Sequence, residues 1–127
     1  GLLAPFSMKQ KLKHNYTVVD NDDNIVCMFG IVPDGGRGII WLLGSPLVDT
    51  YQREFIKNNR KMLNMMQKDF PYVGNYISLE NKKSIKWLRW LGFKFNSKIT
   101  LVKKQEMVYF YKNYNLDKTE RSPPRIT

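Results

Sequence analysis

The most constraining feature of this sequence is a strand–helix–strand unit over residues 39–79. A continuous apolar run, Ile39–Leu43, precedes a long helical pattern that extends to about Lys68, and a second strand pattern follows at Tyr72–Leu79. Two strands joined by a helix of this length pair in parallel, because the chain must return across the sheet before the second strand begins. The sequence therefore predicts a parallel β-α-β crossover at the centre of an α/β domain.

The helix of this unit has an apolar face and a basic face. At 100° per residue, apolar and cationic side chains fall on opposite sides. We expect the apolar side to pack on the sheet and Asp49 with Gln52 to form a capping box at the start of the helix. The apolar positions are Tyr51, Phe55, Ile56, Met62, Leu63 and Met66, and the basic positions are Arg53, Lys57, Arg60, Lys61 and Lys68.

Shorter elements are predicted on both sides of the crossover. Residues 3–13 have a weakly helical pattern, and Asp20–Asn24 is a hairpin turn because Asn and Asp tolerate left-handed backbone angles. Asn81 is placed to cap a second helix, which Gly92 ends. The apolar runs of the two strands before the long helix lack alternation, which predicts cover on both faces. The other expected strands are 16–19, 25–32, 93–95, 99–102 and 107–111.

Positive charge is concentrated in the middle of the chain. The net charge is +10, and residues 51–104 carry 13 Lys and Arg against three Asp and Glu. Such an imbalance favours an anionic partner: nucleic acid, an acidic protein or a phosphorylated cofactor. A solvated helix surface is the alternative. The residues predicted to contact an anion or nucleic acid are Lys57, Lys61, Lys86 and Arg89.

Several kinds of site are not expected. Cys27 is the single cysteine, so no internal disulfide can form, and no metal site is predicted. The turn at Asp20 lacks the glycine and glutamate of a calcium loop, since Ile25 and Ile31 stand at those positions. No apolar run is long enough to span a bilayer, so no membrane partner is expected. Residues 115–127 are expected to form a mobile tail after a domain at 1–114.

The segment Asn81–Phe93 resembles the last-helix signature of the GNAT (Gcn5-related N-acetyltransferase) fold, in which Asn opens the helix and Gly-Phe closes it. Together with Val26–Pro33 and Trp41–Gly44, it is most similar to small GNAT-like, internal-virion-type proteins of short-tailed bacteriophages. The resemblance implies a mixed, mostly antiparallel sheet with one parallel β-α-β crossover and flanking helices. The family's first strand and helix are missing, so the domain would be N-terminally incomplete. It also implies that the two predicted helices lie on opposite faces of the sheet.

The resemblance further implies acetyl-CoA as cofactor, bound between two splayed parallel strands. The cofactor-binding residues would be Asn81, Leu43, Arg53 and Ser84. The family's phosphate-binding loop is rich in glycine, but residues 47–53 of this chain contain none. Leu88 occupies the position at which the family usually has the tyrosine that acts as general acid. Tyr76 and Tyr72 are the candidate catalytic substitutes.

Two functions therefore stay open. One is an N-acyltransferase that moves an acyl group from acyl-CoA to an amine. The other is a non-catalytic phage virion or assembly protein that binds DNA or a protein through its basic face. Either would act in the cytoplasm of a bacterial host or in the virion.

Overall fold

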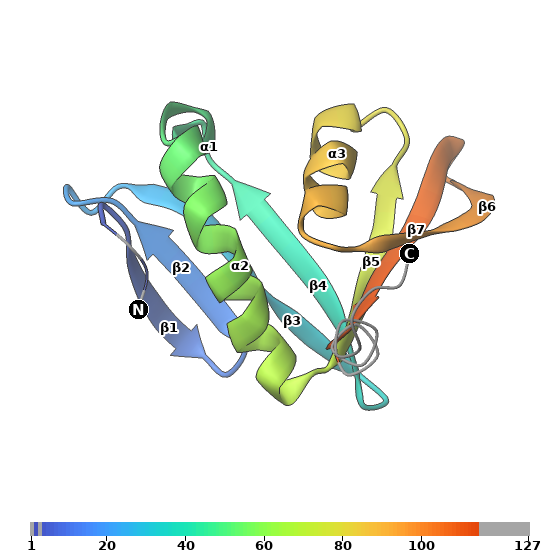
Figure 1. Ribbon diagram of the computed structural model, residues 1–127, viewed down its shortest axis with the longest axis horizontal. Coiled ribbons are helices and arrows are strands. Elements are labelled where there is room, and N and C mark those ends of the chain that lie inside the picture. The colour runs from blue at the N-terminus through green and yellow to red at the C-terminus, as the bar shows by residue number, and fades with distance from the viewer. Residues whose placement is uncertain (1, 3, 115–127) are drawn as a thin grey trace, which may run out of the picture.

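The structure of the protein is a computed structural model that describes residue 2 and residues 4–114 (Figure 1). Seven strands form one sheet in the order β1-β2-β3-β4-β5-β7-β6, and all neighbours are antiparallel except β4 and β5. The expected GNAT-like mixed sheet is thus confirmed. The strands are β1 Ser7–Leu12, β2 Asn15–Val19, β3 Ile25–Asp34, β4 Arg37–Gly44, β5 Tyr72–Ser78, β6 Lys94–Val102 and β7 Gln105–Asn113; the helices are α1 Leu47–Thr50, α2 Gln52–Asp69 and α3 Lys82–Trp90.

The central crossover has the predicted parallel direction. Strands β4 and β5 are the fourth and fifth of seven, and α1 and α2 connect them. The helix start differs from the prediction, because the backbone bends at Tyr51 between α1 and α2, and no side chain caps α2. Asp49 instead forms an ion pair with Lys83 of α3 at 2.8 Å. The predicted capping box is therefore wrong.

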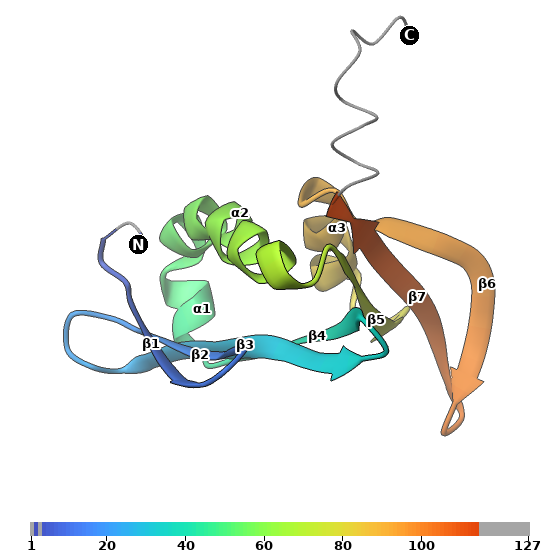
Figure 2. The same cartoon turned by 90° about the horizontal axis from the view of Figure 1, so that it is seen from below.

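All three helices lie on the same side of strands β1–β4, as Figure 2 shows. The expectation of helices on opposite faces is therefore wrong, and so is the expectation that β3 and β4 are covered on both sides. Met28 and Val32 of β3, opposite Leu43 and Ile39 of β4, are exposed on the open face of the sheet. Apolar composition alone did not reveal which face the helices would leave bare.

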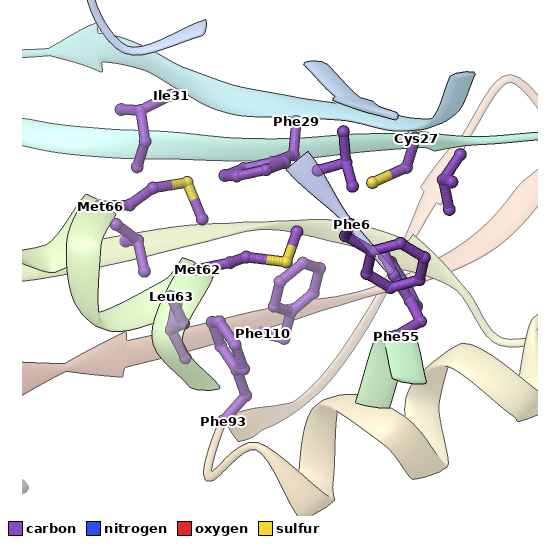
Figure 3. Close-up of a cluster of buried hydrophobic side chains, with 13 residues drawn as sticks. Phe6, Cys27, Phe29, Ile31, Phe55, Met62, Leu63, Met66, Phe93 and Phe110 are labelled. Carbon is purple, nitrogen blue, oxygen red and sulfur yellow. The ribbon is translucent and has the colours of Figure 1, made fainter. Parts of the chain in front are cut away.

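The hydrophobic core lies between α2 and the sheet. Met62 and Met66 of α2 lie against Phe29 and Ile31 of β3, and Leu63 lies beside Phe93 and Phe110 (Figure 3). The predicted apolar face of the long helix is confirmed at these positions. Other buried members of the core are Phe6, Val18, Val26, Cys27, Phe55 and Val73.

The helical prediction near the start of the chain is wrong, and the prediction of a tail at its end stays untested. The region 3–13, predicted to be helical, contains β1, which pairs antiparallel with β2 through partners such as Lys9 and Thr17. Backbone pairing along the edge of β2 outweighs the weak helical pattern there. The predicted tail, 115–127, lies outside the described residues. No helix in the described part of the chain is long and apolar enough to cross a membrane.

Candidate functional site

A cleft opens where β4 and β5 separate. The two strands pair only at Gly38 with Val73 and at Ile39 with Gly74. Beyond these pairs, a cavity of about 340 Å³ lies between the strands, α2 and α3. None of the residues that line it is charged: Phe29, Ile40, Trp41, Leu42, Asn59, Met62, Leu63, Met66, Asn75, Tyr76, Ile77, Asn81, Ser84, Trp87, Leu88, Leu91, Phe93 and Phe110.

Asn75 sits at the point where the strands part. Its Nδ2 donates to the backbone oxygen of Ile40 at 2.8 Å, and its Oδ1 accepts from the backbone N–H of Tyr76 at 2.7 Å. One side-chain amide thus satisfies an acceptor on β4 and a donor on β5 that regular pairing would otherwise satisfy. The apolar pattern of the strand gave no sign of this role.

Asn59 is the second polar residue of the cleft that the sequence pattern did not single out. It lies on α2, only 5% of its surface is exposed, and it lines the cavity. Its Nδ2 is buried and has no hydrogen-bond partner among the described residues. A signal existed, because Asn59 is four residues after Phe55 and four before Leu63, on the stripe that packs into the core.

Some of the residues predicted from the GNAT resemblance meet in this cleft. Asn81, Ser84 and Tyr76 all line the cavity. Asn81 also caps α3 as predicted, since its Oδ1 accepts from the N–H of Ser84 at 3.3 Å. Leu88 lies half-buried against the core and lines the same cavity.

The other predicted residues lie elsewhere. Leu43 is 66% exposed on the open face of the sheet, and Arg53 is exposed at the start of α2. The Tyr72 hydroxyl lies 3.3 Å from that of Tyr109, and the Arg37 guanidinium lies over the Tyr72 ring. Burial, followed by the hydrogen bond to Tyr72, raises the pKa of Tyr109. Tyr72 therefore belongs to an aromatic cluster beside the cleft.

A GNAT-type site would hold the cofactor's phosphates on the turn before α2 and on the first N–H groups of that helix. The donors of the turn are occupied, whereas the N–H groups of Gln52, Arg53 and Glu54, in the first turn of α2, have no acceptor within the helix. The N–H groups of Val48 and Asp49 donate to backbone oxygens of Ser45 and Pro46 at 3.0 and 3.1 Å. Those of Thr50 and Tyr51 donate to Pro46 and Leu47 at 3.4 and 2.8 Å, and that of Leu47 donates to Ser45 Oγ at 3.2 Å. Phosphate binding at such a turn requires free N–H groups. The Asp49 carboxylate beside these groups is paired with Lys83.

Helices α2 and α3 pack directly against each other, and both carry exposed cations. The Phe55 and Trp87 rings lie 5.0 Å apart, and the Arg60 guanidinium lies 4.3 Å from the Trp90 ring centre. A groove of about 380 Å³ runs between the helices. The exposed cations of the two helices are together called the basic face: Arg53, Lys57, Arg60 and Lys61 of α2, with Lys82, Lys83, Lys86 and Arg89 of α3. Of these, Lys83 and Lys86 line the groove, and the Arg89 guanidinium lies 5.2 Å from the ring centre of Phe95 on β6.

Cys27 and the acidic turn offer no reactive or metal-binding centre. Cys27 is fully buried, and burial raises the pKa of its thiol to about 12. Asp20 accepts backbone N–H bonds from Asp22 and Asn24, both at 2.9 Å, as expected of a hairpin turn. Within residues 2 and 4–114, no group of three potential ligands could hold a metal ion.

Comparison with known proteins identifies both a family and a fold. The sequence model of the family described as "Bacteriophage T7, probable scaffold protein Gp13" matches residues 32–100, which is more than half of the chain. The chain belongs to this family. Membership confirms the predicted bacteriophage connection, although the family description does not mention internal virion proteins. No curated protein matches the chain.

Solved structures with a fold similar to that of this Gp13-family chain include GNAT acetyltransferases. The spermidine N-acetyltransferase SpeG F149A mutant from Vibrio cholerae aligns with a TM-score of 0.68 at 11% identity, over 86% of this chain and 69% of that one. A GNAT-family acetyltransferase from Bacillus anthracis aligns with a TM-score of 0.65 at 12% identity, over 80% and 67%. Spermidine N-acetyltransferase from Vibrio cholerae in complex with CoA and spermine aligns at 0.56 and 13%, over 80% and 67%. Identities this low show the fold alone.

The residues of the Gp13-family chain do not fit acyl-CoA in the way the fold implies. The phosphates would meet a turn whose five N–H groups already donate internally, next to the ion pair of Asp49 with Lys83. Leu88, at the position where the GNAT resemblance implies a tyrosine as general acid, cannot donate a proton. The cleft is retained with Asn81, Ser84 and Tyr76 in its lining, but the turn before α2 does not offer its N–H groups to the cofactor's phosphates.

Proposed function

We propose that this chain is a non-catalytic phage assembly protein, which uses the GNAT fold as a scaffold and binds nucleic acid through its basic face. The observation that carries the proposal is the packing of α2 on α3, which brings two helices with exposed cations next to each other. The description of the family as a probable scaffold protein supports the assembly role.

The composition of the basic face favours a polyanion over a small anion. Its eight cations are spread over two helices, and the acidic residues beside them are few, chiefly Asp49 and Glu54. Asp49 is already paired with Lys83. A phosphate backbone presents charges at regular spacing, so several cations can be neutralised at once with release of counterions. Trp90, 47% exposed and already in contact with Arg60, adds an aromatic surface beside this charge.

The test is binding of a labelled 20-base-pair DNA duplex, measured by fluorescence anisotropy over a salt series. Replacing the four predicted contacts, Lys57, Lys61, Lys86 and Arg89, with Glu should abolish binding while the circular dichroism spectrum is unchanged. The matched control replaces Lys13, Lys98, Lys103 and Lys104 with Glu, which changes the net charge equally away from the face. If four phosphates are contacted, log Kd should rise with log salt at a slope of about 3 to 4. Equal losses in both variants, or a flat salt dependence, would refute the proposal.

Acyl transfer from acyl-CoA to an amine is the second candidate. The observation in its favour is that Asn81, Ser84 and Tyr76 line one cavity, and a related structure carries CoA and spermine. Release of CoA from acetyl-CoA in the presence of spermine, followed with a thiol reagent, tests this candidate. Turnover that falls in Tyr76→Phe but not in Tyr72→Phe would support it over the binding role.

A further inference from the structure

We propose that the cleft between β4 and β5 binds an extended, uncharged polypeptide segment of a partner protein by strand addition. The proposal deepens the proposed assembly role, since it assigns a second binding site, on a different part of the fold, to a protein partner. It rests on three features: two unpaired strand edges, an uncharged cavity, and a buried donor without an acceptor.

The unpaired edges belong to the two central strands. After the last pair, Ile39 with Gly74, β4 continues to Gly44 and β5 continues to Ser78 without pairing to each other. Asn75 satisfies the first acceptor and donor beyond the pair, those of Ile40 and Tyr76. Because backbone groups alternate along a strand, Leu42 directs its N–H and C=O to the same side as Ile40, into the cleft.

A polypeptide can match both edges at once. Strands β4 and β5 run in the same direction, so an inserted segment has the same orientation relative to each of them. Unpaired strand edges readily bind a further strand, since every added residue supplies backbone donors and acceptors. The open lengths, Ile40–Gly44 and Asn75–Ser78, correspond to a segment of about four or five residues.

Alternation along the inserted segment gives its side chains two different surroundings. Those that point toward the helices enter the 340 Å³ cavity among Met62, Leu88 and Phe93. Those that point the other way lie between Trp41 and Tyr76, which line the cleft from the open face of the sheet. The lining residues carry no charge, so an ionised side chain in the cavity would be desolvated without a partner.

Asn59 favours one kind of side chain at the inward-pointing position of the bound segment. Asn59 lines the cavity, and its buried Nδ2 has no acceptor among the described residues, which is unfavourable for a donor. A neutral side chain with an acceptor near its end, such as glutamine, would both fill the cavity and satisfy this donor. The preferred segment therefore has glutamine at the inward position and uncharged residues on either side.

The test uses a displayed library of random nonapeptides with the intact chain as bait. We expect enrichment of an uncharged motif with glutamine at one inward position, and slower hydrogen exchange at Leu42 when a selected peptide binds. Ser84→Phe, which places a ring in the cavity, should weaken binding at least tenfold. Ser97→Phe, at an exposed position of β6, is the matched control and should bind normally.

Selectivity tests the role of Asn59. Asn59→Leu removes the donor and should shift preference from glutamine to leucine peptides about fivefold to tenfold, the effect of one hydrogen bond. No enrichment with the folded chain, or equal binding to Ser84→Phe and wild type, would overturn the proposal. Its failure is separable from failure of the basic-face proposal, because Ser84→Phe should keep full DNA affinity and the four-cation reversal should keep full peptide affinity.

Discussion

Asn75→Ala should destabilise the protein by removing the link between the separating central strands. Two hydrogen bonds are lost, from Nδ2 to Ile40 O at 2.8 Å and from the Tyr76 N–H to Oδ1 at 2.7 Å. At about 1 kcal/mol each, with a further penalty for the half-buried groups left unpaired, the free energy of unfolding should fall by about 2 to 3 kcal/mol. The opening beside them admits water, which keeps the loss at this level.

Urea denaturation followed by tryptophan fluorescence measures the change in the free energy of unfolding. In a thermal denaturation of the same variant, we expect the midpoint temperature of a domain of this size to fall by about 3 to 5 °C for each kcal/mol lost. Asn64→Ala is the matched control, because Asn64 is exposed on α2 and its replacement should change stability by no more than about 0.5 kcal/mol. A loss for Asn75→Ala as small as that of the control would refute the role of Asn75 as a structural link.

Three further predictions follow from burial and electrostatics. Cys27, fully buried and with a thiol pKa raised to about 12, should not react with a thiol reagent at pH 8 until the protein is unfolded in guanidinium. The hydrogen bond from the Asn24 backbone is the main cause that lowers the pKa of Asp20 in the folded protein. The ionised carboxylate therefore stabilises the fold fully above the unfolded-state pKa of about 4, and this stabilisation is lost as the pH falls through the lower folded-state pKa. Asp20→Asn should therefore flatten the acid limb of a stability–pH curve, and an unchanged limb would contradict this. Phe55→Ala should cost about 3 to 5 kcal/mol, since the ring is buried against Trp87, and a loss below 1 kcal/mol would show that α3 does not depend on it.

The sequence contained enough information for the central crossover and for the faces of α2. Apolar strands flanking a two-faced helix leave little choice of topology, and the exposure of Lys57 and Lys61 follows from the burial of Phe55 and Met62. It could not reveal which side of the sheet α3 would cover. That placement depends on contacts between distant residues, such as Arg60 with Trp90, which no local pattern encodes.

The candidate site was predicted only in part, for a related reason. Asn81 and Ser84 were found through a motif, and both do line the cleft. Asn75 and Asn59 were not singled out, because each lies inside an otherwise regular strand or helix and acts through a partner, or a missing partner, far along the chain. The occupied N–H groups of the turn before α2 are likewise a property of backbone geometry, which the absence of glycine only suggested.

The most direct measurement of the central claim is calorimetric titration of the intact chain with acetyl-CoA. We propose that the cleft between β4 and β5 is kept for binding a macromolecule, since the N–H groups of the turn over Leu47–Tyr51 are not free to hold the cofactor's phosphates. We therefore expect no saturable heat at millimolar acetyl-CoA under conditions where the DNA duplex binds. A one-to-one isotherm with acetyl-CoA that disappears in Ser84→Phe would contradict it and place the cofactor in the cleft.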